Sequence, residues 1–338
     1  MKVQKGFSLI ELMIGIALGL IILAALTSFF VSSSGTRNSI ERTSRQIENG
    51  RYAMNAIRDE IHLAGFYAEL VTGSAVWGMP DPCQNTVPQM GMTLAGLNVP
   101  LPITGYADGI ATPACIVNRV NGTDVLVIRR FGTEPVPVGT QTGQDYYWQP
   151  SRCKTDSTTV PWIFDQGANQ TWNTLHKLDC TTSADLYKWR VNIFYVRDYS
   201  YTVGDGIPTL VKLELDPSNP AGAPIVNAGI ATVPIAEGIA SLRLEYGVDN
   251  DNDGLPDVWL RCDTATPCTN AQWANVTAVR VHILAKNTEA EPIGSYTDTK
   301  VYDMGTGANP VGPFNDLFKR HVYAGVVSAP NRTGPREQ

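Results

Sequence analysis

An apolar run of 25 residues lies close to the N-terminus of this 338-residue chain. It spans residues 7–31 and follows a short basic leader that contains Lys2 and Lys5. At about 1.5 Å per residue, a tilted helix of this length crosses a hydrocarbon core of about 30 Å. The run is therefore predicted to be a membrane-spanning helix, and the rest of the chain must fold at one end of it.

One carboxylate, Glu11, interrupts the apolar run. A charged side chain inside a bilayer costs about 2.5–3.5 kcal/mol on insertion scales, so it needs a partner that a single helix in lipid does not provide. The partner is predicted to belong to another subunit, which makes Glu11 a candidate assembly residue.

The small residue Gly6 precedes the apolar run, whereas a secretory signal places its cleavage site after the run. Cleavage beside Gly6 would leave the whole helix on the mature protein. Lys2 and Lys5 lie on the short N-terminal side and favour a cytoplasmic N-terminus. The remainder of the chain is therefore expected on the opposite side of the membrane.

Residues 5–19, KGFSLIELMIGIALG, resemble the class III signal of type IV prepilins and pseudopilins. The resemblance implies that a membrane prepilin peptidase cuts between Gly6 and Phe7 and methylates the amine of Phe7. It also implies that Glu11 pairs with the N-terminal amine of a neighbouring subunit during assembly. A plain signal anchor with an incidental glutamate is the alternative interpretation.

Beyond a polar patch at residues 32–35, the chain is predicted to continue as an amphipathic helix. Apolar residues recur every seven positions, and further apolar residues lie between them on the same face of the helix. Charged residues of both signs lie on the other faces. This stripe is expected to pack under a globular head, and Gly65 is expected to end the helix near Ala64. The members of the stripe are Ile40, Ile47, Met54, Ile57, Ile61 and Ala64.

About 270 residues follow the helix, rich in Gly and Pro and in short stretches of alternating apolarity, which predicts a β-rich head. Residues 186–196 alternate in the manner of a half-buried strand. Residues 242–248 and 279–285 repeat this pattern, and residues 124–128 are apolar on both faces. Together these strands predict a central antiparallel sheet.

The chain is accordingly predicted to be an α+β protein with a pilin-like architecture, in which a long N-terminal helix packs against a β-rich head with an antiparallel sheet. The expected segments are a leader peptide (1–6), a transmembrane or filament-core half of the helix (7–31), an amphipathic half (32–65) and an extracytoplasmic head (66–338). Within the head, residues from about 77 to 170 are expected to form long loops or an inserted subdomain.

Segments at both ends of the chain also resemble the PilW branch of the minor pilins. They are AIRDEIHLAGFYAEL at the end of the helix and, in the C-terminal half, IASLRLEYGVDNDNDGLPDVW, AVRVHILAKN and FKRHVYAGVV. The middle third of the chain carries no such resemblance.

Six cysteines lie on the expected extracytoplasmic side of the helix, which favours disulfides in an oxidising periplasm. Six cysteines allow fifteen connectivities, of which sequential pairing is preferred here. Zinc binding is not indicated, because paired short spacings and nearby histidines are absent. The predicted bonds are Cys262–Cys268, which closes a short loop, Cys153–Cys180 and Cys83–Cys115.

A second local motif is DNDNDGLPD at residues 249–257, which resembles the DxDxDGxxD calcium loops of thrombospondin type 3 and dockerin repeats. Alternate residues of a tight turn direct oxygens inward, and Gly254 lets the backbone bend sharply. Leu260 stands where a full EF-hand has its bidentate glutamate, and a solvated acidic turn is the alternative. The expected ligands of a structural Ca²⁺ are the carboxylates of Asp249, Asp251, Asp253 and Asp257 and the carbonyl of Leu255.

Neither catalysis nor nucleic-acid binding is predicted. The four histidines have no motif partner that would make one a general base, and no nucleophile and base pair is apparent, so the chain is not expected to be an enzyme. The net charge of −6 argues against a broad surface for nucleic acid.

The resemblance instead implies a minor pilin, a structural subunit that primes type IV pilus assembly and lies at the pilus tip. Its expected partners are other minor pilins, the major pilin, the prepilin peptidase and a tip adhesin. Its expected location is the inner membrane, with a cytoplasmic N-terminus and a periplasmic head, and then the pilus on the cell surface. The alternatives are a GspJ-like pseudopilin of a type II secretion system and a calcium-dependent tip adhesin on a pilin stalk.

Overall fold

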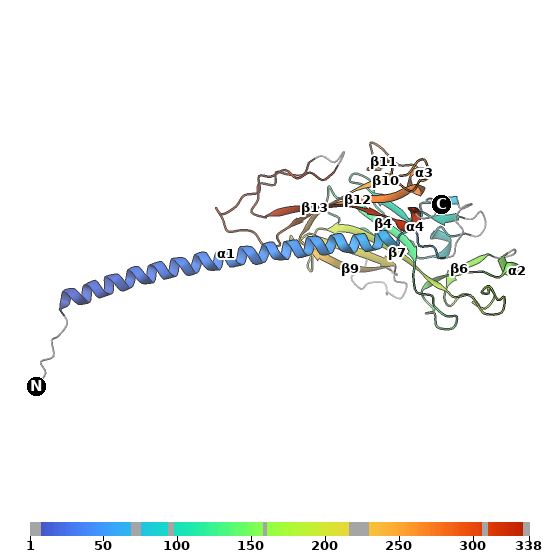
Figure 1. The fold of residues 1–338 in the computed structure, drawn as a ribbon, viewed down its shortest axis with the longest axis horizontal. Helices are drawn as coiled ribbons and strands as arrows, with labels where there is room; N and C mark the ends of the chain where they lie inside the picture. The colour runs from blue at the N-terminus through green and yellow to red at the C-terminus, as the bar shows by residue number, and fades with distance from the viewer. Residues whose placement is uncertain are drawn as a thin grey trace, which may run out of the picture.

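The computed structural model describes residues 8–68, 76–93, 98–157, 161–215, 230–305 and 310–333. A 55-residue helix, α1 (Leu9–Leu63), runs out of a β-rich head and gives the molecule an elongated outline (Figure 1). This arrangement confirms the predicted α+β, pilin-like fold.

Helix α1 ends where the sequence predicts. The N–H of Ala64 donates to the carbonyl of Ile61 at 3.1 Å and closes the last turn. Gly65 follows with a φ of 72°, in the left-handed region that glycine enters without steric cost. Its N–H donates to the carbonyl of Arg129 in β4 (Val125–Phe131) at 3.2 Å, so the chain passes from the helix directly onto a sheet.

The described part of the head contains two antiparallel sheets and a small parallel pair of strands. The smaller antiparallel sheet has the order β11 (Val258–Leu260), β10 (Ile239–Val248), β12 (Val276–Lys286), β13 (Arg320–Ser328). The larger has the order β3 (Ile103–Tyr106), β4, β7 (Tyr187–Arg197), β5 (Tyr146–Pro150), β6 (Trp162–Gln166). In addition, β8 (Thr209–Leu215) pairs with β7, and β9 (Ile230–Glu237) pairs with β8. The parallel pair is β1 (Val76–Gly78) and β2 (Asn98–Pro100), and the short helices are η1 (Val87–Gln89), α2 (Lys154–Ser157), α3 (Asn270–Ala274) and α4 (Pro330–Thr333).

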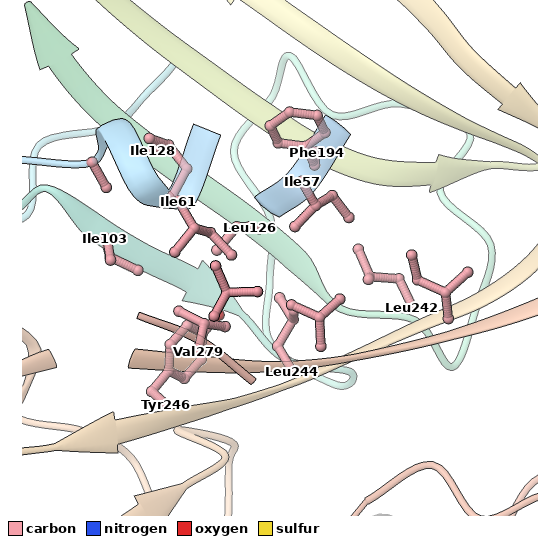
Figure 2. Close-up of a cluster of buried hydrophobic side chains, with 14 of the residues drawn as sticks. Ile57, Ile61, Ile103, Leu126, Ile128, Phe194, Leu242, Leu244, Tyr246 and Val279 are labelled. Atoms are coloured by element: carbon pink, nitrogen blue, oxygen red, sulfur yellow. The ribbon is translucent and has the colours of Figure 1, made fainter. Parts of the chain in front are cut away.

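Two hydrophobic cores lie on opposite faces of the seven-stranded sheet, because alternate residues of its strands point to opposite sides. The first core lies between the two sheets and α1. Figure 2 shows its centre, where the helix contributes Ile57 and Ile61 and the larger sheet contributes Leu126, Ile128 and Phe194. The second core is rich in aromatic residues and includes Tyr67, Phe131, Tyr146, Trp148, Trp162, Phe164 and Trp189.

The predicted strands are present, with one correction to their burial. Strands β10 and β12 direct the predicted apolar residues into the first core, and residues 125–128 are buried on both faces as expected. The prediction of a half-buried strand at residues 186–196 is wrong for the second half of β7. There Phe194 faces the first core, and Asn192 is only 4% exposed because α1 covers that face and Glu60 of the helix bonds to its side chain.

Residues from about 77 to 170 are part of the head and not a separate subdomain. Strands β3 to β6 all belong to the seven-stranded sheet, although the connections between them are long. The buried guanidinium of Arg129 helps to fasten this segment. It donates to the carbonyls of Pro80 at 2.8 Å and Leu101 at 3.1 Å and to the hydroxyl of Thr104 at 3.0 Å.

The apolar stripe on α1 is covered by the head along only part of its length. Residues 54, 57, 61 and 64 lie in the first core as predicted. However, Ile40 is 64% exposed and Ile47 is 39% exposed, which contradicts their predicted burial. In this part of the helix the residues that face the head are Gln46 and Gly50, both of which are buried.

Close packing and hydrogen bonding explain why a polar residue and a glycine replace the isoleucines at this contact. The side-chain amide of Gln46 donates to the carbonyls of Ala285 at 2.9 Å and Lys319 at 2.8 Å. A Cβ atom added to Gly50 would clash with the ring of Tyr323 on β13. Apolar periodicity does not reveal such positions, because neither residue is a large apolar one.

We expect Gly50→Ala to lower the free energy of unfolding by about 1–3 kcal/mol, the usual range for overpacking a filled site. Gly35→Ala is the matched control, because no heavy atom lies within 4 Å of the corresponding Cβ position in the projecting helix. The control should leave the stability unchanged or raise it by up to about 1 kcal/mol. Denaturant unfolding of the full chain in detergent measures both variants, and equal values would contradict the close contact.

Candidate functional sites on the helix and the acidic loop

The N-terminal half of α1 leaves the head entirely (Figure 1). Every residue from 9 to 38 is exposed, and the hydrogen bonds to the head begin at Ser39, whose hydroxyl accepts from Lys319 Nζ at 3.0 Å. The helix is long and apolar enough to cross a membrane, and none of its apolar window is buried in the head. An apolar surface of this extent requires lipid or other subunits to cover it.

Glu11 lies in the first turn of this projecting half. Its Oε2 accepts the N–H of Ser8 at 2.9 Å, which satisfies one of the amides left open at a helix N-terminus. Glu11 is exposed and forms no ion pair with any residue that the structure describes. The predicted processing residues Gly6 and Phe7 lie outside the described residues.

Ion pairs hold the other half of α1 on the head at the end nearer the projecting helix. Arg42 lies 3.2 Å from the buried carboxylate of Glu291, which Lys319 also approaches at 3.3 Å. Arg45 lies 3.2 Å from Glu289 at the surface. The buried pairs restrict the helix to one register on the head, because displacing either partner would leave an unpaired buried charge.

A second ion pair fastens the distal end of the helix. Arg130 of β4 donates to both carboxylate oxygens of Glu60, at 2.9 and 3.2 Å. Burial raises the pKa of Glu60, but the hydrogen bonds from Arg130 and Asn192 and the nearby charge of Lys212 outweigh it, so this pKa lies below its usual range. Glu60 therefore stays ionised at neutral pH despite its burial.

The acidic loop at residues 249–257 connects β10 to β11. Asp249 is fully buried, and its two carboxylate oxygens accept the N–H groups of Asn252 at 2.7 Å and Gly254 at 3.0 Å. Gly254 has a φ of 91°, a conformation that requires glycine. At the end of the loop, Asp257 Oδ2 accepts the N–H of Asn250 at 2.6 Å. These bonds hold the turn closed around Asp249.

Three of the four predicted carboxylate ligands converge in this loop. Oxygens of Asp249, Asp251 and Asp257 all lie within 4.8 Å of one another. This spacing suits Ca²⁺, whose oxygen ligands each lie about 2.3–2.6 Å from the ion. Asp253 is not in this group, since its Oδ1 accepts the N–H of Leu255 at 2.7 Å.

The three predicted disulfides are present. Their Cα atoms are 5.7, 4.9 and 4.8 Å apart for Cys83–Cys115, Cys153–Cys180 and Cys262–Cys268 respectively. The last of these closes a short loop directly after β11, next to the acidic loop. Cys83 and Cys115 both lie in the chain that precedes β4, whereas Cys153 and Cys180 lie on either side of β6 and cross-link its two flanking connections.

Sequence reasoning missed an ion network that joins the two sheets. Asp124 is buried, lies 3.4 Å from Arg243 and 3.3 Å from Arg261, and accepts the N–H groups of Leu244 at 2.8 Å and Asp108 at 3.0 Å. Burial raises the pKa of Asp124, and the two guanidiniums oppose that rise. Both arginines are more than 100 residues from Asp124 in sequence, so no local motif could have revealed the network.

The PilW family model, described as Type IV Pilus-assembly protein W, matches residues 193–331, and the prokaryotic N-terminal methylation motif matches residues 1–27. These two matches support a PilW-type pilin. The first match begins within β7 and ends in α4, so it contains the whole four-stranded sheet. The second match covers the predicted leader and most of the apolar run of this pilin.

A solved structure of a type IV-like pilin from Thermus thermophilus is similar to this pilin. The alignment covers 86% of this chain and 97% of that chain, with 12% identity and a TM-score of 0.35. No curated protein sequence matches the chain. Pilins are a structural, non-enzymatic class whose members contact other pilins and the assembly machinery.

We expect Asp249→Ala to lower the free energy of unfolding by about 1–3 kcal/mol even in excess EDTA, because two loop amides then lose their acceptor. Asp253→Ala is the control, since that exposed carboxylate lies outside the converging group. It should cost less than half as much. Denaturant unfolding in EDTA measures both, and equal losses would argue against a structural role of Asp249.

Proposed function

We propose that this pilin is a minor pilin, a structural and non-catalytic subunit that joins other minor pilins to start type IV pilus assembly and lies at the pilus tip. The observation that carries the proposal is the exposed 30-residue half of α1, from residue 9 to residue 38. Lipid covers this apolar surface before assembly, and the helices of other pilins cover it afterwards.

The shape of the head supports a position at the end of the filament. Strands β5 and β6 extend the head beyond the C-terminal end of α1, on the side opposite the projecting helix (Figure 1). A subunit inside a filament must leave room for the subunits stacked above it. A head extended in this direction is accommodated best where few subunits follow.

Processing and orientation follow from the N-terminal signal. In this proposal the prepilin peptidase cuts between Gly6 and Phe7, the N-terminus faces the cytoplasm, and the head folds in the periplasm, where its three disulfides form. Glu11 then neutralises the methylated amine of a neighbouring subunit. Because this pairing requires a neighbour beyond Glu11, the subunit is not the topmost one of the tip complex.

We expect a methylated Phe7 peptide in filaments sheared from cells. N-terminal peptide mass spectrometry of sheared filaments and of the remaining envelope measures it. The same peptide confined to the envelope would favour the GspJ-like secretion pseudopilin instead. An intact Met1 peptide in both fractions would contradict processing altogether.

Glu11→Ala should reduce incorporation into filaments by about tenfold or more, which corresponds to the loss of about 1.4 kcal/mol or more of assembly energy. Glu41→Ala is the control, because Glu41 is an exposed carboxylate of the same helix outside the apolar run and has no ion pair among the described residues. Its incorporation should match that of the wild type. Equal incorporation of both variants, quantified in sheared filaments, would count against the pairing role of Glu11.

The acidic loop is proposed to bind a structural Ca²⁺ through Asp249, Asp251 and Asp257. The convergence of their oxygens and the burial of Asp249 support this proposal. The ion would offset the repulsion among three carboxylates and brace the turn between β10 and β11. A calcium-dependent tip adhesin is the alternative function that such a loop would serve.

Millimolar Ca²⁺ should raise the melting temperature of the full chain in detergent, because a ligand that binds only the native state stabilises it, by about 2.7 kcal/mol at 100 times its Kd. Asp251→Asn should abolish the shift and leave the hydrogen bonds of Asp249 in place. Asp253→Asn should retain it. The absence of any shift in the wild type would leave only the solvated acidic turn.

A further inference from the structure

Strand β13 forms an open edge of the four-stranded sheet. It pairs with β12 along its whole length, from Arg320 opposite Lys286 to Ser328 opposite Ala278, without a bulge. On its other side, the backbone of residues 321–328 receives no hydrogen bond from any residue that the structure describes. The outward-facing amides and carbonyls of this strand are therefore available to another chain.

The bonds at the two ends of the ladder show which backbone groups face the open edge. The N–H of Asn287 donates to the carbonyl of Lys319 at 3.0 Å, and the N–H of Ala329 donates to the carbonyl of Thr277 at 2.8 Å. Bonded and non-bonded pairs alternate along an antiparallel ladder, so the odd-numbered residues of β13 bond to β12 and the even-numbered ones point away. The central residues that point to the open edge are Val322, Ala324 and Val326.

This edge lacks the features that usually prevent strands from pairing. Residues 322–328 include neither a charged residue nor a proline, and Val326 is 59% exposed. On the opposite face, the Cβ position of Gly325 has open space around it. By contrast, the edge strand β9 carries Pro234 and the edge strand β11 has only three residues.

We propose that β13 accepts an extended, uncharged segment of another filament protein, which adds to the four-stranded sheet as a fifth strand. Three outward N–H groups and three outward carbonyls from residues 322, 324 and 326 would bond to it. The apolar side chains of these residues would lie beside its own, and the space at Gly325 admits one of its side chains on the other face. The inference rests on the proposed function, because the partner must be a component of the filament.

The membrane anchor excludes antiparallel pairing with the same edge of a second copy. β13 runs away from the projecting helix, because it begins next to Lys319, which bonds to Gln46, and leads to Asn331, which bonds to Ala64 at the end of α1. Antiparallel pairing of two such strands would therefore set their helices antiparallel, whereas helices anchored in one membrane run in the same direction.

Parallel pairing of identical edges fails for a different reason. In a parallel ladder, a residue whose N–H and C=O face the partner strand bonds to the two residues that flank the one directly opposite it. Outward-facing residues of the two strands must therefore lie one residue out of step with each other. A two-fold axis parallel to the strands places identical residues at the same height and allows no such offset. A symmetric two-fold pair of β13 edges is therefore excluded, and the proposal assigns the added strand to a segment of different sequence.

Ala324→Pro tests the backbone bonds directly, because it removes the central outward N–H and leaves the ladder bonds of residues 323 and 325 to β12 in place. Ala324→Val is the matched control, since it changes the side chain and keeps the N–H. Full-length chains are expressed in piliated cells, and their amounts in sheared filaments are measured relative to the membrane. We expect the proline variant to fall about tenfold or more and the valine variant to stay within about twofold of the wild type.

The melting temperature of each variant in detergent shows whether it folds. If Ala324→Pro does not fold, Val326→Lys takes its place, because it keeps every backbone group and places a charge on the edge. Recovery of the folded test variant at the wild-type level would overturn the inference. Absence of the wild-type chain from filaments would contradict the proposed function instead.

Hydrogen exchange provides a second measurement on the unmodified protein. In the detergent-extracted chain, the amides of residues 322, 324 and 326 should exchange rapidly and those of residues 323, 325 and 327 slowly. In filaments both sets should exchange slowly, because the added strand protects the outward amides. Rapid exchange of the outward amides in filaments that contain the chain would also overturn the inference.

Discussion

The burial of the C-terminal half of α1 in the first core is the contact on which the rest of the structure depends. Ile57 and Ile61 are fully buried among residues of both antiparallel sheets, and each contributes about 1.5–3 kcal/mol relative to an exposed side chain. Because the helix continues without a break, this one contact also sets the direction in which the projecting half leaves the head (Figure 1). Part-buried pairs such as Glu60 with Arg130 then restrict the helix to one register.

The second core explains how the head supports a long middle segment. The aromatic core on one face of the seven-stranded sheet includes side chains of β5 and β6 and of the connections that precede them, so these connections are held by packing as well as by two disulfides. Arg129 adds three hydrogen bonds to the same segment. The PilW match lies outside this segment.

The proposed roles are distributed along the length of the molecule. The projecting helix presents apolar surface and Glu11 at one end, whereas the acidic loop lies beside the distal end of the smaller sheet. The open edge of β13 runs between these regions in the same direction as α1, so a neighbour anchored through its own helix can present a strand beside it. Anchoring by the helix and pairing by the edge are independent contacts, and their combination would discriminate among neighbours better than an apolar helix alone.

Local patterns were enough to predict the helix and its end at Gly65, the strands at residues 242–248 and 279–285, the short Cys262–Cys268 loop and the acidic loop, because each depends on residues close together in sequence. The exposure of Ile40 and Ile47, the burial of Gln46 and Gly50, and the network around Asp124 were not predictable. These features depend on which distant segment packs against each residue: Tyr323 against Gly50, the helix against Asn192, and two arginines from the other sheet around Asp124. The sequence by itself thus determined the elements and the membrane anchor. Only the tertiary structure decided which faces are covered and that the edge of β13 stays open, because those properties arise from contacts between segments that no local pattern connects.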